Sequence, residues 1–236
     1  MEFLVLFVAV GLGAVVQGSV GFGFALVVVP ALTLVRPEVL PATVLLLTMP
    51  MAMTMAVRER RAIDVPGLAY LLLGRLAGTL AGVGLLLLVP ERFLSVLFGS
   101  LVLVAVLTSL FSPKVDLRNR TRVAGGVASG IMGTAAGIGG PPLALIYQNH
   151  SGPQIRSTLA VAFSMGTAIS LLTLAVAGKV GPGHLLLALG LLPALLIGLW
   201  SARFLAGLLA GRWLRPAILL FAAISGLTAV LLGIVA

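Results

Sequence analysis

The sequence predicts an all-α polytopic membrane protein, with one membrane transport domain over residues 1–236. Hydrophobic residues make up 60% of the chain and charged residues only 9%, whereas charged residues make up about 25% of an ordinary soluble domain. The mean hydropathy is +1.23. Apolar runs recur along the whole chain, and many reach the length of about 20 residues that a bilayer-spanning helix needs. No polar linker or low-complexity stretch marks off a separate soluble domain.

The apolar runs predict the elements in chain order. The first run, 3–35, contains the glycine-rich stretch GSVGFGFALVVVP at 18–30, and the fifth run, 123–148, contains GTAAGIGGPPLAL at 133–145. Each of these two is followed by three uninterrupted spans, at 39–57, 65–89 and 93–111 and then at 157–178, 184–206 and 213–235. The first run is much longer than the apolar region of about 7–15 residues in a signal peptide, so we expect it to remain in the mature protein.

An internal repeat relates the two halves of the chain. A shift of about 116 positions aligns the glycine-rich stretches and brings one Pro-Gly pair onto another; the aligned residues include Gly21 with Gly137, Gly23 with Gly139, and Pro66-Gly67 with Pro182-Gly183. We therefore predict repeat one over 1–112, a basic cytoplasmic loop over 113–122 and repeat two over 123–236. Each repeat would hold one glycine-broken element, either a re-entrant hairpin or a pair of short helices, and three transmembrane helices.

The distribution of basic residues favours inverted repeats. Cytoplasmic loops of membrane proteins are enriched in Lys and Arg. If each glycine-broken element crosses the membrane once, the two faces carry 8 and 6 loop Lys and Arg residues; if it returns to its starting side, they carry 11 and 3. The face with 11 comprises Arg58, Arg60, Arg61, Lys114, Arg118, Arg120, Arg122, Arg156, Arg203, Arg212 and Arg215. This distribution predicts inverted repeats with both termini outside. The net charge of +9 then indicates contact with the anionic inner leaflet rather than with nucleic acid.

The glycine-rich stretches predict a binding site near the middle of the membrane. Backbone that leaves its helical hydrogen bonds inside hydrocarbon survives only where protein or water satisfies it. Helix N-termini exposed at such breaks present N–H groups and a positive dipole end, both of which favour an anion. The predicted binding residues are Gln17, Ser19, Gly21, Gly23, Thr134, Gly137, Gly139 and Gly140, with Thr48 and Ser164 from the helices that follow. The alternative is that these glycines only allow helices to cross closely.

Arg75 is the second candidate. It lies about ten residues into the span 65–89, near half the depth of the bilayer. Ionisable residues at that depth are rare and usually functional, and the internal repeat aligns Leu191 with it. We expect Arg75 to complement an anionic substrate. The alternative is a structural hydrogen bond to helix carbonyls or a side chain that reaches the interface.

Residues that are absent narrow the chemistry. The chain has no cysteine, and its acidic residues, Glu2, Glu38, Glu59, Asp64, Glu91 and Asp116, fall in termini or loops. Thiolate metal sites and cysteine nucleophiles are therefore excluded. A proton relay of buried carboxylates or an acidic cation site is unsupported. No catalytic residue, metal or cofactor is expected.

Several segments resemble the TauE/SafE family of sulfite exporters and organosulfonate permeases. The similar segments are VVQGSVGFGFALVVVPAL at 15–32, GIGGPPLALIYQ at 137–148 and RSTLAVAF from Arg156. The resemblance implies a permease of a bacterial-type plasma membrane (cell inner membrane). It would move sulfite, an organosulfonate or a sulfocarboxylate together with a proton or another ion.

Three functional classes stay open at this point. The first is a secondary transporter that works by alternating access, the second is an anion channel with the same site, and the third, less favoured, is a membrane-embedded enzyme. The sequence leaves the direction of transport and the oligomeric state open, a homodimer included.

Overall fold

The computed structural model describes residues 1–58, 63–111, 116, 118–147, 152–209 and 214–235, and these residues form helices and no strand. The first half of the chain contains α1 (Glu2–Val20), α2 (Phe24–Val35), the short 3₁₀ helix η1 (Pro37–Val39), α3 (Ala42–Arg58), α4 (Val65–Leu88), η3 (Glu91–Phe93) and α5 (Leu94–Leu110). The second half contains α6 (Asn119–Ala136), α7 (Gly140–Tyr147), α8 (Gly152–Val176), α9 (Pro182–Leu209) and α10 (Leu214–Val235).

The predicted all-α polytopic class is confirmed. In the described part of the chain, six helices are long and apolar enough to cross a membrane; they lie at Glu2–Ser19, Val65–Leu88, Glu91–Leu110, Gln154–Val176, Pro182–Leu205 and Pro216–Val235. Five of them coincide with predicted uninterrupted spans. The sixth is α1, which is only the first half of the glycine-rich run 3–35. The predicted span 39–57 is α3, whose 17 residues give about 25 Å of helix, slightly less than the hydrocarbon thickness.

The outward surface is apolar, as a lipid environment requires. Large side chains stand more than half exposed on the long helices, for example Leu186 at 69% and Leu232 at 60%. Such an apolar periphery around a packed interior is typical of helices whose solvent is lipid.

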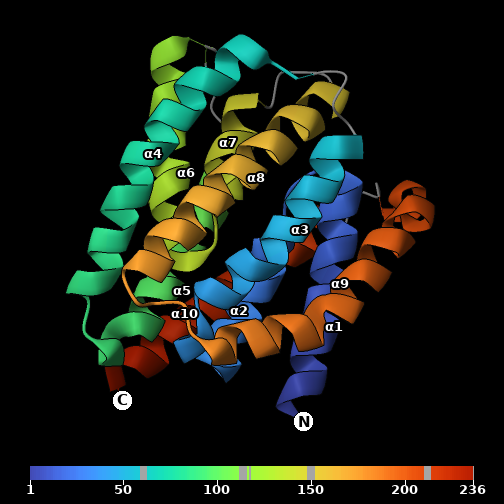
Figure 1. Ribbon diagram of the computed structural model, residues 1–236. Coiled ribbons are helices and arrows are strands. Elements are labelled where there is room, and N and C mark those ends of the chain that lie inside the picture. Colours follow the sequence, from blue (N-terminus) through green and yellow to red (C-terminus); the bar gives the residue numbers. More distant parts are fainter. Residues whose placement is uncertain (59–62, 112–115, 117, 148–151, 210–213, 236) are drawn as a thin grey trace.

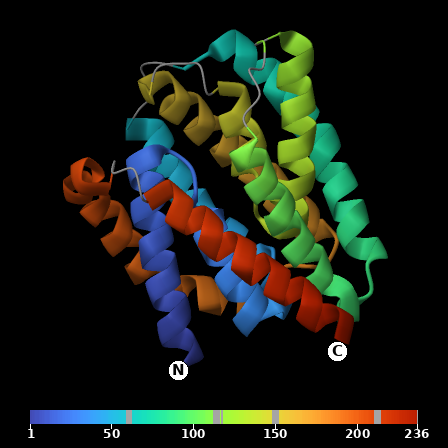
Figure 2. The same cartoon turned by 180° about the vertical axis from the view of Figure 1, so that it is seen from behind.

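The helices pack in pairs that join the two halves of the chain. α4 packs mainly against α6, α1 against α9, α5 against α10 and α3 against α8. Figures 1 and 2 show that both termini lie at the same end of the molecule. In Figure 1, α1, α3 and α9 run from that end to the opposite end, whereas α4, α6 and α8 run back towards it.

Glycines bring the backbones of paired helices into direct contact. A Cβ on Gly78 of α4 would collide with the carbonyl oxygen of Val127 on α6, and a Cβ on Gly126 of α6 would collide with the carbonyl oxygen of Leu71 on α4. Such glycines recur every four residues on each helix, so they lie on one face of it. They are Gly74, Gly78 and Gly82 on α4 and Gly126 and Gly130 on α6. This is the small-residue packing that dominates helix association in membranes.

Candidate functional site

One pocket lies where both glycine-rich stretches meet the long helices. Its lining comes from α1, α2, α3, α4, α6, α7 and α8 and comprises Gln17, Gly23, Phe24, Ala25, Leu26, Leu45, Thr48, Arg75, Gly133, Gly137, Gly139, Gly140, Pro141, Phe163 and Thr167. The predicted candidates Gln17, Gly23, Thr48, Arg75, Gly137, Gly139 and Gly140 are therefore brought together around one space.

The connections between helices at this pocket depend on glycine. α1 ends at Val20 and α2 begins at Phe24; between them Gly21 has φ +96° and Gly23 has φ +117°. α6 ends at Ala136, and Gly137 has φ +79°. Only glycine enters this left-handed region without a steric cost. The chain can therefore reverse within about three residues and expose backbone at the pocket.

The two short helices that begin at these connections differ in their N–H groups. The backbone N–H of Phe24 donates to Oε1 of Gln17 at 3.1 Å, so the Gln17 side chain caps α2. Gln17 is 5% exposed, and its side-chain amide also carries two N–H donors. In α7, Pro141 and Pro142 occupy the first turn and have no N–H to donate.

Arg75 lies at the centre of the interior and is 1% exposed. Its Nη1 donates to Oγ of Ser129 on α6 at 2.8 Å, and the Ser129 hydroxyl donates to the carbonyl oxygen of Gly139 at 2.7 Å. The Phe163 ring lies beside the guanidinium, with 5.9 Å between Cζ and the ring centroid. Ser129 therefore links the buried cation to the glycine segment before α7.

The Arg75 guanidinium has no acidic partner among the described residues. The ion pairs there are Arg36–Glu38, Arg118–Asp116 and Arg122–Asp64, and the buried Nε of Arg75 has no hydrogen-bond partner in the same part of the chain. A buried charge without a counter-charge is destabilising, because the protein has removed it from water without replacing that solvation. An anion in the adjacent pocket would supply the missing charge.

Gly166 on α8 creates the space that the guanidinium fills. A Cβ at this position would collide with Nε, Cδ and Cζ of Arg75. Two further glycines lie close to the same group: a Cβ on Gly133 would be 3.3 Å from Nη2, and one on Gly139 would be 3.3 Å from Nη1. Bare backbone thus surrounds much of the cation.

Four predicted site residues do not line the pocket. The hydroxyl of Ser19 donates to the Val15 carbonyl at 2.8 Å, and that of Ser164 donates to the Ala160 carbonyl at 2.8 Å, as serines commonly do within helices. Gly21 lies against Arg156 of α8. Thr134 is fully buried and its Oγ1 bonds the hydroxyls of Thr79 and Ser170, at 3.3 and 2.8 Å.

Several site residues were missed from the sequence, namely Ser129, Gly133, Phe163, Gly166 and Thr167. Helical spacing carried a signal for some of them. Ser129 and Gly133 are four residues apart, as are Phe163 and Thr167, so each pair lies on one helix face.

The long apolar helices identify a multi-pass membrane protein, and its pocket is lined by a buried cation that has no acidic partner in the part of the chain that the structure describes. The chain belongs to the Sulfite exporter TauE/SafE family, whose model matches residues 5–229. This confirms the resemblance, and it makes the chain a member of a family of membrane transporters whose function is sulfite export. No curated protein and no solved structure matches the chain.

Proposed function

We propose that this protein is a secondary transporter that moves sulfite, an organosulfonate or a sulfocarboxylate by alternating access. The anion binds in the central pocket at Arg75, between the glycine segments around Gly23 and Gly139. The observation that carries this proposal is the buried Arg75 guanidinium, whose Nε is unbonded and which has no carboxylate partner in the described part of the chain.

The chemistry of the pocket supports an oxyanion as the ligand. A guanidinium offers its N–H groups in a planar fork that matches two oxygens of a carboxylate, sulfonate or sulfite. Nη1 is already bonded to Ser129 and Nε packs against Gly166, so Nη2 is the nitrogen that we propose to bind the ligand. Gln17 and Thr48 supply further polar groups along the pocket wall. The glycines let the ligand approach the main chain without an intervening side chain.

The two halves of the chain are proposed to be inverted repeats, with repeat one over 1–112 and repeat two over 123–236. The helix pairs support this arrangement. The shift of about 116 residues relates α1 to α6 and α4 to α9, and the packing of α4 on α6 is matched by the packing of α1 on α9. Related helices also run in opposite directions in Figure 1. Inverted repeats around a central site are the common basis of alternating access in secondary transporters.

The end of the molecule opposite the termini is proposed to face the cytoplasm, with both termini outside. Arg58, Arg118, Arg120, Arg122 and Arg156 belong to helix ends there, whereas Arg36, Arg92 and Lys179 belong to the end that holds the termini. The excess of positive charge supports this orientation. The described residues do not include Arg60, Arg61, Lys114 or Arg212. Positions 113–115 and 117 of the predicted loop also lie outside them.

Ligand binding to purified protein tests the site. Sulfite, sulfoacetate or taurine should raise the melting temperature, because a ligand that binds only the folded state stabilises it. Arg75→Gln removes the charge at similar length and should abolish this rise. Arg92→Gln, at an exposed arginine on η3, should keep it. The absence of any response to these anions, and to sulfate and simple carboxylates, would sink the proposal.

Counterflow in liposomes separates a carrier from an anion channel. Labelled sulfite or sulfonate should accumulate transiently against unlabelled substrate inside, and the initial rate should saturate with concentration. Large anion conductance without counterflow would instead favour a channel with the same site. Repeating the assay across a pH gradient would identify a coupled proton.

A further inference from the structure

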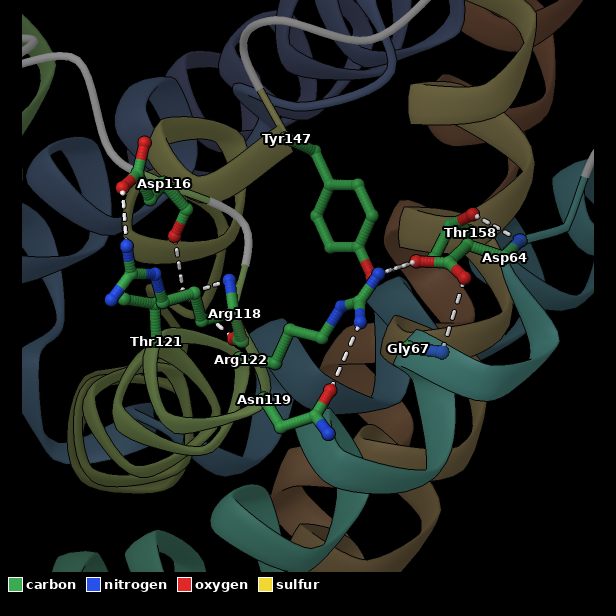
Figure 3. A network of polar contacts seen from close by, with 9 residues as sticks. All are labelled: Asp64, Gly67, Asp116, Arg118, Asn119, Thr121, Arg122, Tyr147 and Thr158. Carbon is green, nitrogen blue, oxygen red and sulfur yellow. Dashed lines mark hydrogen bonds and ion pairs between the residues drawn. The ribbon is translucent and has the colours of Figure 1, made fainter.

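A second polar cluster lies away from the pocket, around Asp64 at the start of α4 (Figure 3). Oδ1 of Asp64 accepts from the backbone N–H of Gly67 at 3.1 Å and caps the helix. Oδ2 accepts from Nη2 of Arg122 on α6 at 2.7 Å. The two charged side chains are only 12% and 15% exposed, so this ion pair is more strongly desolvated than a surface pair.

Two hydrogen bonds connect Asp64 to the neighbouring helices. The Tyr147 hydroxyl, at the end of α7, donates to Oδ2 of Asp64 at 3.2 Å. The backbone N–H of Asp64 donates to Oγ1 of Thr158 on α8 at 3.0 Å. The Asp64–Arg122 pair lies within the tightly packed α4–α6 pair, whereas the bonds to Tyr147 and Thr158 join that helix pair to α7 and α8.

This cluster lies on the path from the pocket to one end of the molecule. The same four helices that carry it also line the pocket, through Arg75 of α4, Gly133 of α6, Gly140 of α7 and Phe163 of α8. Along α4, Asp64 precedes Arg75 by about three helical turns, or ~16 Å. The cluster therefore lies between the pocket and the end where α4, α6 and α8 begin (Figure 1).

Apolar side chains fill the space between the pocket and the cluster. They form a small core separate from the main one and comprise Ala52, Leu71, Leu143, Ile146, Tyr147, Leu159, Ala162 and Phe163. Phe163 lines the pocket at one end of this core, and the Tyr147 ring at the other end carries the hydroxyl that bonds Asp64. An anion that leaves towards this end must separate these side chains.

The opposite end has no such polar cluster at the related positions. The shift of about 116 residues relates Asp64 to Val180, Arg122 to Leu6, Tyr147 to Ala31 and Thr158 to Ala42. Leu6, Ala31 and Ala42 are buried, and Val180 packs against the main apolar core. The bonds around Asp64 are thus specific to one end and do not belong to the symmetric framework.

We propose that Tyr147 and Thr158 form a polar latch on Asp64, which holds the pocket closed towards the end where α4 begins. The latch rests on the proposed transport function and adds its control of access. The ion pair with Arg122 holds the Asp64 carboxylate in position. Separation of α7 and α8 from α4 breaks both latch bonds and opens the pocket to that end.

Thiol labelling tests the latch and needs no substrate. The chain has no cysteine, so Ala25→Cys introduces a single thiol at the pocket wall. A membrane-impermeant thiol reagent is applied to one face of proteoliposomes at a time, and Arg120→Cys, exposed at the start of α6, identifies the face concerned. Tyr147→Phe and Thr158→Val, which keep the side-chain shape, should each speed pocket labelling from that face about tenfold, because each loses a buried hydrogen bond.

Tyr70→Phe is the matched control, since Tyr70 is the other tyrosine of the chain and its side chain is 39% exposed on α4. It should label like the parent. Parental labelling in both Tyr147→Phe and Thr158→Val, at unchanged melting temperature, would refute the latch. If one of these two variants has a lowered melting temperature, the labelling rate of the other variant decides the test. The proposed function is tested separately, by whether anions raise the melting temperature, and that result does not depend on the labelling rates.

Discussion

Among the residues that the structure describes, Ser129 alone forms a hydrogen bond with the Arg75 guanidinium. The Ser129 hydroxyl accepts a hydrogen bond from Nη1 and donates one to the Gly139 carbonyl. The position of the cation is therefore tied to the glycine segment before α7. An anion bound to the guanidinium, as proposed, would offset the cost of this buried charge. The affinity for the proposed anion would then include the removal of that cost.

Gly166→Ala should displace Arg75 and remove anion binding. The added Cβ would collide with Nε, Cδ and Cζ of the arginine, so the guanidinium must leave its place beside Ser129. We expect the anion-induced rise in melting temperature to disappear, as in Arg75→Gln, although the arginine is still present. Gly183→Ala is the control, because a Cβ there meets nothing within 4 Å. A parental anion response in Gly166→Ala would contradict this account of the site.

The sequence predicted the centre of the site better than its surroundings. Arg75 and the glycines are conspicuous because charge and backbone freedom are unusual inside an apolar span. Ser129 is not, since a serine within a helix usually bonds its own backbone. Only the packing of α6 on α4 brings Ser129 opposite Arg75. The same packing turns Thr134 towards Thr79 and away from the pocket.

At the scale of elements, α4 and α6 behave as one unit because their backbones touch. Glycines recur on α4 at 74, 78 and 82 and on α6 at 126 and 130, and each meets main-chain atoms of the partner helix. The apolar run 65–89 predicted α4 to within one residue, whereas α6 is only the first part of the glycine-broken element predicted over 123–148 and begins four residues earlier. It did not predict their pairing, since a small-residue stripe carries no information on which helix it meets.

Gly78→Ala should destabilise the protein far more than Gly84→Ala. The Cβ at Gly78 would collide with the Val127 carbonyl, whereas at Gly84 it meets nothing within 4 Å. Overpacking of this kind typically costs about 1–3 kcal/mol, while alanine in open space favours the helix. Melting temperatures in detergent measure the difference. Equal melting temperatures for the two variants would contradict a close backbone contact between Gly78 and Val127.

At the scale of the whole molecule, the pairs α4–α6 and α1–α9 both contribute to the pocket lining, through Arg75 and Gly133 and through Gln17, and the proposed repeat relates the two pairs. The internal repeat was visible in the sequence through Pro66-Gly67 and Pro182-Gly183. The sequence did not decide whether each glycine-rich run forms a re-entrant hairpin or a pair of short helices. Of the described helices in these two runs, α1 is both long and apolar enough to span the membrane. α6 is similar in length, at 18 residues, but less apolar, and α7 has only 8 residues.

Single-cysteine accessibility tests the inverted arrangement. Arg120→Cys, Arg203→Cys and Lys179→Cys each replace one exposed basic residue in a chain without native cysteine. Inverted repeats predict that an impermeant reagent reaches the thiols at 120 and 203 from one face and the thiol at 179 from the other. Parallel repeats would instead group 120 with 179 and leave 203 on the far face, which would overturn the proposed topology.

The glycine contacts also limit how this protein can change shape. Where main chain rests on main chain, as Gly78 does on Val127 and Gly198 of α9 does on Gly11 of α1, neither helix can turn or slide by itself. The pairs α4–α6 and α1–α9 should then move as rigid units. Any change of shape would occur at the neighbouring helices, whose contacts are made by side chains. Small residues far from the proposed anion site would thereby decide which helices can move during the proposed transport.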